Sequence, residues 1–406
     1  MWPGRHRYKR LPNRVLRTLA VSNYRSLRDL LVPLGPLVVI TGANGSGKSS
    51  LYRCLTLLHD AAHGRLVRSL AQEGGLQSTL WAGPETISRA MRTGQVPIQG
   101  TVRTKPIHLR LGFSSDDFGY SLELGPPPRN TARAFDLDPE IKREVIWAGP
   151  SLNRHNALAD RQRRLLLSAD DEGRWTEVER DVPMFESLLT RIADPVRTPE
   201  VLVLRERIRE WRFYDQLRAD REAPSRRPQV GTWTPVMAAD GSDLAAAIRT
   251  LQLTDHDRAY KAFSVVIDDA FPGSSVQIHE DMAFLRLQMT QPGMLRPLSA
   301  AELSEGTLRF LMLAAALLSA YPPDLLVLNE PESSLHVDLL PALGRLIRRA
   351  AERSQVMVVT HATSLADALL EHPEALHHVL VKDFGETQLE GQGLLDKPSW
   401  HWPARK

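Results

Sequence analysis

Residues Gly42-Ala43-Asn44-Gly45-Ser46-Gly47-Lys48-Ser49 match the pattern G-x-x-x-x-G-K-[ST]. An apolar run at 36–41 precedes them and predicts a strand, and residues 50–58 predict the helix that follows. The glycines let backbone N–H groups curve around phosphate oxygens, and the helix N-terminus adds free donors and partial positive charge. The stretch therefore predicts a strand, loop and helix that bind the phosphates of a nucleotide.

Each residue of this loop has an expected role. Lys48 is expected to reach the β- and γ-phosphates, and the Ser49 hydroxyl is expected to hold Mg²⁺. The residues expected to bind the nucleotide here are Gly42, Ala43, Asn44, Gly45, Ser46, Gly47, Lys48, Ser49 and Ser50.

The bulk composition is that of a globular protein with a substantial core. The 406 residues suffice for one large domain or two ordinary ones, and 42% of them are hydrophobic. No apolar run approaches the roughly 20 residues of a membrane span, and the basic residues 1–10 lack the apolar segment of a secretory signal. The one cysteine, Cys54, cannot form an internal disulfide. We therefore expect a protein of the reducing cytoplasm with no membrane partner.

The charge pattern is only mildly informative about partners. The net charge is +3, and because 8 of the 51 basic residues are lysines, 43 are arginines. Arginine clusters at 5–17 and 161–164 fit phosphate contact, since a guanidinium group can donate two parallel hydrogen bonds to phosphate oxygens. The alternative is a solvated surface in a chain whose arginine bias reflects genome composition. The net charge is too small to establish nucleic-acid binding.

Between the loop and the C-terminal third, strand and helix patterns alternate. Residues 15–22 and 30–32 predict strands before the loop, and residues 218–233 predict an exposed linker. Period-2 stretches predict antiparallel strands at 107–112, 120–124, 144–147, 164–167, 276–279 and 284–289. Helices are predicted at 185–194, 198–217, 242–251 and 255–270, with Ser242 and Asp255 as caps of the last two.

Two apolar strands near the C-terminus end in polar residues. The first, at 324–330, ends in Glu330, where a carboxylate can take a proton from, or orient, an attacking water. The second, at 356–361, ends in His361. Taken alone, each residue reads as an ordinary surface glutamate or a structural histidine. Beside a phosphate loop, function at the carboxyl ends of parallel strands is the better interpretation.

A third segment, Leu303-Ser-Glu-Gly-Thr-Leu-Arg309, precedes a strongly helical run. Ser304 and Gly306 are expected at the N-terminus of that helix, which is a ready phosphate site. The alternative is a plain helix cap without a ligand.

The order of these motifs resembles that of ATP-binding-cassette (ABC) ATPases. Within that superfamily the chain is similar to the RecF and SMC-like branch, and most similar to the bacterial "predicted ATPase" family related to the ATPase half of OLD-family nucleases. The segments that carry this resemblance are Val21–Leu27, the phosphate loop, Leu303–Arg309, Asn329–His336 and Val359–His361.

The resemblance implies an architecture. We expect an α/β fold: an ABC-type P-loop NTPase head with a mixed sheet, an antiparallel β subdomain and an inserted helical lobe. The core is expected to be discontinuous, formed by residues 1–60 and 296–395, with the β and helical lobe at 61–295 and a tail at 396–406.

The resemblance also implies a composite ATP site. In such heads two copies pair, and each ATP lies between the phosphate loop of one copy and the signature segment of the other. Ser304 and Gly306 would then touch a γ-phosphate held by the partner's Lys48, and residues 333–336 would cross the dimer interface. Within one copy the expected catalytic residues are Lys48, Glu330 and His361, and Ser49 and Asn329 are expected to hold Mg²⁺.

The chain departs from the family pattern at three places. Asn329 stands where an acidic residue is common, so an uncharged amide would hold the metal-bound water. The signature reads Ser-Glu-Gly rather than Ser-Gly-Gly. The glutamine that usually follows the phosphate loop is not fixed by the sequence, since Gln77, Gln95 and Gln99 are all candidates.

Spacing distinguishes among the relatives. Ser304 lies 256 residues after Lys48, farther than in a transport ATPase, and no coiled-coil insertion of the SMC type is present. The 45 residues after His361 are too few for a nuclease domain. The first hypothesis is an ATP-hydrolysing homodimer acting on DNA in repair, recombination or antiphage defence. The second is a slow, ATP-gated module that controls a separate effector such as a nuclease or toxin.

Overall fold

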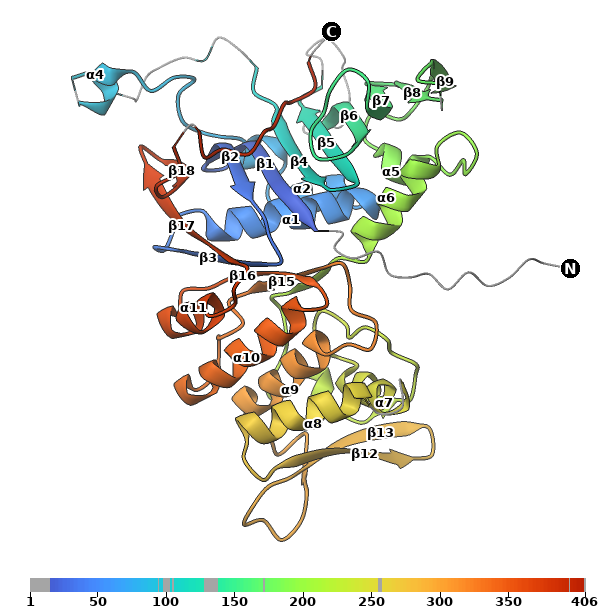
Figure 1. The fold of residues 1–406 in the computed structure, drawn as a ribbon, viewed down its shortest axis with the longest axis vertical. Coiled ribbons are helices and arrows are strands. Elements are labelled where there is room, and N and C mark those ends of the chain that lie inside the picture. Colours follow the sequence, from blue (N-terminus) through green and yellow to red (C-terminus); the bar gives the residue numbers. More distant parts are fainter. Residues whose placement is uncertain are drawn as a thin grey trace, which may run out of the picture. The chain divides into compact units, whose positions relative to one another are not determined.

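The computed structural model describes residues 15–404 except 94, 98–102, 104, 105, 128–137, 171, 255–257 and 394. The chain folds into two compact units, each formed by separate stretches of sequence (Figure 1). The first consists of Met1–Leu34, Cys54–Arg209 and Lys382–Lys406, and the second of Gly35–Arg53 and Glu210–Val381. The expected domain borders at residues 60, 296 and 395 stay a prediction, whereas these units divide after residues 34, 53, 209 and 381.

The first unit is built on an antiparallel sheet of eight strands in the order β2-β1-β4-β5-β6-β7-β8-β9. The strands are β1 (Leu16–Tyr24), β2 (Leu27–Pro33), β4 (Leu109–Ser115), β5 (Phe118–Gly125), β6 (Glu140–Ala148), β7 (Ala157–Gln162), β8 (Leu165–Ala169) and β9 (Trp175–Glu179). All six strands predicted for this region are confirmed. The predictions missed β7 and β9, because neither has a clean period-2 apolar pattern.

A buried polar network fixes this sheet to the short helix beside it. Glu144 of β6 accepts hydrogen bonds from the Tyr120 hydroxyl at 2.7 Å, Arg161 at 2.9 Å, the Ser187 hydroxyl at 2.6 Å and the Leu188 N–H at 2.9 Å. Burial raises the pKa of Tyr120 well above its ordinary value. Arg161 is fully buried, so the interpretation of this arginine as part of a surface cluster is wrong.

Helices complete the first unit. They are the part of α1 (Lys48–Ala62) from Cys54 onward, α2 (Leu66–Gln72), α3 (Leu76–Thr79), α4 (Arg89–Arg92), α5 (Leu188–Arg191) and α6 (Pro199–Arg209), and the unit also contains β18 (Glu386–Leu389). The helix predicted at 185–194 shrinks to α5, because Ser187 caps it and Ile192 is already extended. The helix predicted at 198–217 ends at Arg209.

The second unit contains a parallel sheet in the order β10-β15-β16-β3-β17. The strands are β10 (Arg212–Tyr214), β15 (Leu325–Asn329), β16 (Gln355–Val359), β3 (Leu37–Gly42) and β17 (Ala375–Asp383). The three middle strands are almost wholly buried, as expected for a parallel sheet covered on both faces. The strand β10 corrects the prediction of helix there, because pairing with β15 overrides the local helix preference.

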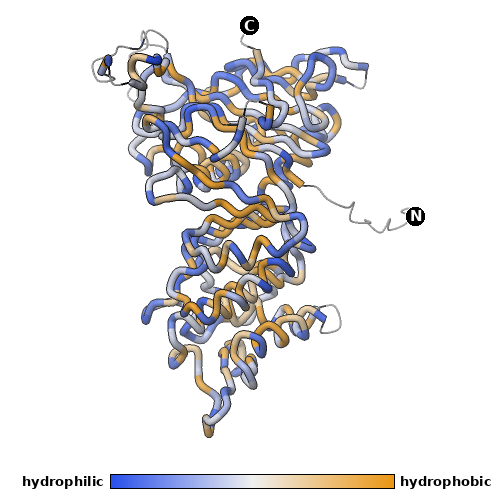
Figure 2. The backbone as a smooth tube through the Cα atoms, turned by 60° about the vertical axis from the view of Figure 1, so that its left-hand side comes forward, coloured by the Kyte–Doolittle hydropathy of each residue, from blue (hydrophilic) through white to orange (hydrophobic). Residues whose placement is uncertain are grey.

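Among the described residues, further helices and a small antiparallel sheet complete the second unit. The helices are α7 (Leu244–Leu253), α8 (Arg258–Ala270), α9 (Glu305–Leu317), α10 (Leu340–Ala351) and α11 (Thr363–Leu370), and the strands are β11 (Gln229–Val230), β12 (Ser275–Asp281), β13 (Phe284–Thr290) and β14 (Leu298–Ser299). In Figure 2 the hydrophobic stretches follow the strands and helices, and α9 is buried at nearly every position after its first turn.

Two local predictions in this unit need correction. The stretch 218–233 is not simply an exposed linker, because it contains the 3₁₀ helix η1 (Pro224–Arg226) and the buried Ala223. Its Arg226 donates hydrogen bonds to the carbonyl oxygens of Ala300 and Leu303 at 3.0 and 2.7 Å. The residue before α7 is Asp243 rather than Ser242, and the cap expected at residue 255 lies outside the described residues.

The expected antiparallel β subdomain, helical lobe and P-loop core are all present, so the predicted α/β fold class is confirmed. None of the helices in the described part of the chain is long and apolar enough to cross a membrane.

Candidate functional site

Three predicted motifs meet at one edge of the parallel sheet. Val359 at the end of β16 lies opposite Asn329 of β15 on one side and Ile40 of β3 on the other. The Glu330 N–H donates to the Val359 carbonyl at 2.8 Å, and the Thr360 N–H donates to the Ile40 carbonyl at 3.0 Å. The phosphate loop, Glu330 and His361 therefore leave neighbouring strands at the same carboxyl edge, where parallel sheets bind ligands.

The loop backbone has the conformation that its glycines predict. Gly42, Gly45 and Gly47 have φ values of 144°, 76° and 111°, which side-chain-bearing residues rarely adopt. A Cβ on Gly42 would collide with the Leu380 carbonyl oxygen and lie 2.8 Å from the Ser46 hydroxyl. At Gly45 a Cβ would meet no described atom within 4 Å. The loop is thus closely packed at Gly42 and open at Gly45, where phosphates would approach the backbone.

Lys48 is folded over this loop. Its ammonium donates hydrogen bonds to the carbonyl oxygens of Gly42 at 2.6 Å and Ala43 at 3.2 Å, and the residue is only 7% exposed. Ser49 is exposed in the first turn of α1, and Ser50 behind it is buried. This arrangement places the ammonium of Lys48 against the loop backbone and an exposed serine at the start of α1, the two groups expected to bind phosphate and Mg²⁺.

Glu330 has an unusual backbone conformation. Its φ of 49° is in the left-handed region, which for a residue other than glycine costs on the order of 1–3 kcal/mol and persists only where surrounding structure enforces it. The side chain is 44% exposed, and its Oε1 lies 3.7 Å from Nδ1 of His361. The carboxylate is thus held at the sheet edge and remains accessible to water, which is compatible with the expected role of a base.

Glu332 is a site residue that the sequence predictions did not assign. Its Oε1 accepts hydrogen bonds from the Thr360 hydroxyl at 2.6 Å and the His361 N–H at 3.0 Å, and lies 3.2 Å from Nδ1 of His361. Unlike Glu330, it is only 7% exposed. The available signal was a second carboxylate two positions after Glu330, beyond a proline.

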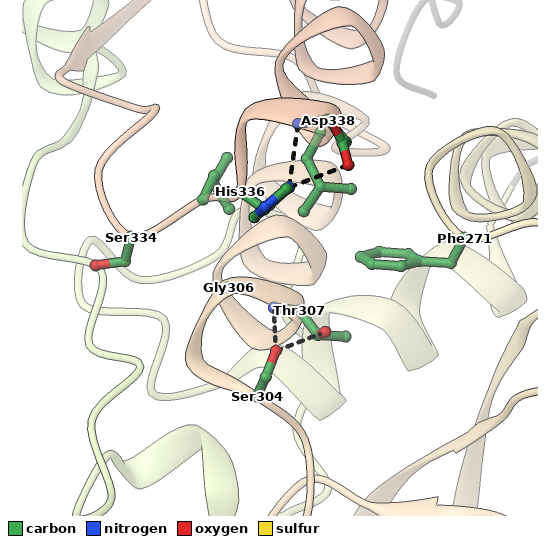
Figure 3. A pocket seen from close by; sticks show the side chains of 9 residues that line it. Phe271, Ser304, Gly306, Thr307, Ser334, His336 and Asp338 are labelled. Atoms are coloured by element: carbon green, nitrogen blue, oxygen red, sulfur yellow. Dashed lines mark hydrogen bonds and ion pairs between the residues drawn. The ribbon is translucent and has the colours of Figure 1, made fainter.

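The signature segment forms a pocket on the same unit. Ser304 caps α9 as predicted, since its hydroxyl accepts a hydrogen bond from the Thr307 N–H at 3.1 Å and lies 2.8 Å from the Thr307 hydroxyl (Figure 3). The pocket has a volume of about 670 Å³. Its lining residues are Phe271, Ser304, Gly306, Thr307, Ser334, Leu335, His336, Asp338 and Leu339.

The pocket and the phosphate loop use different residues. Lys48, Glu330 and His361 are not among the described residues that line the pocket, although residues 334–336 follow Glu330 closely in sequence. His336 is turned toward Asp338, with Nδ1 3.2 Å from a carboxylate oxygen (Figure 3). Within one copy of the chain, the signature pocket and the phosphate loop are therefore formed by different residues.

Mg²⁺ is a hard cation that proteins usually bind through one or two side chains together with the phosphates of the substrate. The two residues expected to hold it here fit this pattern. Ser49 offers an exposed hydroxyl and Asn329 a half-buried amide at the sheet edge, and both supply oxygen ligands. Across the described residues, no group of three His, Cys, Asp or Glu could form a protein-only metal site. Of the glutamine candidates, Gln77 and Gln95 are exposed in the first unit, and Gln99 lies outside the described residues.

A comparison with protein families identifies the family to which the chain belongs. Residues 37–367, more than four-fifths of the chain, match the family described as "AAA domain, putative AbiEii toxin, Type IV TA system". The chain belongs to this AAA-domain family. The match contains the phosphate loop, the signature segment, Glu330 and His361. The match supports the predicted P-loop ATPase, and a short segment of the chain resembles an OLD protein, as predicted.

Curated relatives match only short segments. The OLD nuclease of Thermus scotoductus is 46% identical over 44 residues, which are 11% of this chain and 8% of the relative. UvrABC system protein A of Deinococcus radiodurans is 37% identical over 81 residues, 19% of this chain and 7% of the relative. The protein of the same name from Synechocystis is 38% identical over 85 residues, which are 21% of this chain and 8% of the relative. The matches span less than a tenth of each relative's own length.

Solved structures of SMC heads are similar over most of the chain. The SMC head domain from Thermotoga maritima has a TM-score of 0.41 at 16% identity, covering 93% of this chain and 99% of that one. The SMC head bound to the C-terminal winged-helix domain of ScpA has a TM-score of 0.49 at 13% identity, covering 94% of this chain and 98% of that one.

Proposed function

We propose that this AAA-domain ATPase closes into a homodimer on two molecules of ATP and opens when they are hydrolysed. Ser49 and Asn329 are the residues that would hold Mg²⁺. The observation that carries the proposal is that the loop with Lys48 and the pocket with Ser304 are formed by different residues of one chain, and we interpret them as two half-sites. A second copy related by a two-fold axis would bring each half-site to its complement.

The chemistry follows from the residues at the sheet edge. Lys48 and the loop N–H groups would hold the β- and γ-phosphates and neutralise the charge that develops as the γ-phosphoryl group leaves. Glu330 would accept a proton from the attacking water, and its exposure and fixed backbone suit that role. His361 would contact the γ-phosphate from the neighbouring strand. Mg²⁺ would supply charge neutralisation at the phosphate oxygens.

We propose DNA as the substrate on which the closed dimer acts. Support comes from the relatives, because one matched protein is a nuclease and two are components of the UvrABC system. The excess of arginine over lysine is compatible with phosphate contact. We further propose a cytoplasmic location.

The test combines two substitutions at the first half-site. Glu330→Gln should keep ATP binding, abolish hydrolysis and trap a dimer with ATP, as measured by light scattering after size exclusion. Lys48→Ala should bind no ATP and stay monomeric under the same conditions. A Glu330→Gln protein that binds ATP but remains a monomer would contradict the dimer, and wild type that hydrolyses no ATP with or without DNA would contradict the enzyme. Stimulation by DNA should weaken as salt rises.

A second function is favoured by one residue and by the family. Asn329 carries no charge where an acidic side chain would strengthen metal binding, which favours slow turnover. The family description names a toxin of a toxin–antitoxin system. On this alternative the chain is an ATP-gated regulator of a separate effector protein such as a nuclease or toxin. Turnover far below one per minute, with ATP-dependent dimerisation intact, would favour the regulator over the DNA-acting enzyme.

A further inference from the structure

The buried carboxylate of Glu332 contacts the turn that follows β16. Glu332 Oε1 accepts hydrogen bonds from the Thr360 hydroxyl at 2.6 Å, the His361 N–H at 3.0 Å and the Ala362 N–H at 3.3 Å. The three donors belong to consecutive residues, so one oxygen atom fixes the whole turn between β16 and α11. Hydrogen bonds to an ionised acceptor are about twice as strong as neutral ones.

The same oxygen also lies close to the ring of His361. Nδ1 lies 3.2 Å from Glu332 Oε1 and 3.7 Å from Glu330 Oε1. The imidazole is 54% exposed, whereas the Glu332 side chain is 5% exposed, so the carboxylate is a fixed point and the ring is the group that it positions. A proton on Nδ1 would face Glu332, which leaves Nε2 as the nitrogen directed away from the carboxylate.

The other oxygen of Glu332, Oε2, is buried and has no hydrogen-bond partner among the described residues. Burial lowers the pKa of Arg309 in α9, and the negative charge of Glu332 offsets part of that effect. Arg309 follows Ser304 by five positions, and its guanidinium also donates to the Leu217 carbonyl at 3.1 Å. The charge of Glu332 thus acts on Arg309 of α9 as well as on the turn that carries His361.

We propose that Glu332 is the positioning residue for His361. It holds the backbone of the turn and the Nδ1 side of the ring, so that Nε2 is presented to the γ-phosphate. This inference rests on the proposed ATPase function, but it concerns a residue that would not itself touch the nucleotide. Groups that orient a catalytic side chain in this way typically change activity by about 10–100-fold when they are removed.

The decisive measurement is a double-mutant cycle in the full-length chain. Glu332→Gln keeps an oxygen acceptor for the turn but loses the charge, and we expect kcat to fall at least about tenfold with ATP affinity within about threefold of wild type. In a His361→Ala background the same substitution should change kcat less than about twofold, because a residue that acts through His361 has nothing left to position. Equal losses in both backgrounds would overturn the proposal.

A control variant separates positioning from general stability. Thr360→Val removes one hydrogen bond to Glu332 but leaves the His361 contacts, so its kcat should stay within about threefold of wild type. A loss as large as that of Glu332→Gln would show that the turn merely needs all of its hydrogen bonds, and would contradict the assigned role.

A spectroscopic measurement tests the proposal even if the Glu332→Gln variant does not fold or the wild-type protein hydrolyses no ATP. In ¹⁵N-histidine spectra of the wild-type protein, with His361 assigned by its loss in His361→Ala, Nδ1 should carry a proton at neutral pH. An unprotonated Nδ1 would overturn the proposal independently of any ATPase assay, whereas failure of ATP hydrolysis with Nδ1 protonated would count against the proposed function alone.

Discussion

Gly306 in the first turn of α9 lies directly against the backbone of Ser334. A Cβ on Gly306 would stand 2.9 Å from the Ser334 carbonyl oxygen, closer than real Cβ atoms approach. The helix that begins at Ser304 and the segment that follows Glu330 are therefore in backbone contact. The glycine of the Ser-Glu-Gly signature is required by this close approach, whatever further role it has toward a nucleotide.

The first prediction is that Gly306→Ala impairs the signature pocket and spares the phosphate loop. The added methyl group must displace either the start of α9 or residue 334, and neither is the flexible end of a side chain. We expect ATP affinity within about threefold of wild type and ATPase activity reduced more than about tenfold, since displacements of about 1 Å can cost about 100-fold. Nucleotide titration and a steady-state assay measure the two quantities. Gly231→Ala, whose Cβ would meet only ordinary contacts at 3.5 Å and beyond, is the control and should behave like wild type.

A second prediction concerns Asn329 at the end of β15. Asn329→Asp adds a carboxylate at the position expected to hold Mg²⁺, and carboxylates bind this hard cation more tightly than amides do. The Mg²⁺ concentration for half-maximal ATPase activity should fall by about tenfold or more, equivalent to about 1.4 kcal/mol. A Mg²⁺ titration of activity measures it. Gln72→Glu, an equal charge change on the exposed surface of α2, should leave the titration unchanged. If Asn329→Asp leaves the Mg²⁺ titration unchanged, the assignment of Asn329 to the metal site is wrong.

The third prediction tests the polar network inside the first unit. Glu144→Ala removes the acceptor of four hydrogen bonds and leaves the guanidinium of Arg161 buried without its carboxylate. Breaking a buried pair in this way costs about 3–5 kcal/mol of unfolding free energy. Urea unfolding followed by circular dichroism should show an earlier transition. Glu177→Ala breaks only the exposed pair with Arg180 and should leave the transition in place, so equal shifts in the two variants would contradict the assignment.

The phosphate loop and the strands around it were predictable because their physics is local. Three glycines with positive φ, an apolar run before them and a lysine after them describe one structure, and the parallel sheet joined Gly42, Glu330 and His361 at one edge as expected. The helix cap at Ser304 was predictable for the same reason. The roles of these residues in catalysis stay predictions.

What the sequence did not reveal depends on contacts between distant segments. Residues 212–214 read as helix, but pairing with β15 makes them a strand. Arg161 read as part of a surface cluster, but Glu144, 17 positions earlier, draws it into the core. Glu332 received no assignment, because its donors lie 28–30 positions later in the chain. In each case the deciding partner is non-local, and no local pattern records it.

The last prediction uses two aspartates before α7 whose pKa values shift in opposite directions. Burial raises the pKa of Asp243 above its ordinary value, despite a hydrogen bond from the Ala238 N–H at 2.9 Å. Burial also acts on Asp240, but hydrogen bonds from Ser242, including its N–H at 3.0 Å, outweigh it and lower that pKa. Ionisation of Asp243 therefore opposes folding, and ionisation of Asp240 favours it.

The two neutral variants should consequently differ in sign. Asp243→Asn keeps the acceptor for Ala238 and removes a charge that destabilises the folded state as pH rises from about 3.8 through the raised pKa, so it should be more stable than wild type at pH 7 and lose that advantage near pH 4. Asp240→Asn should be less stable than wild type at pH 7, because the stabilisation present above pH of about 3.8 is lost. Urea midpoints of the three proteins between pH 4 and pH 8 measure both effects. Shifts of the same sign in the two variants would show that side-chain packing, rather than ionisation, controls this turn.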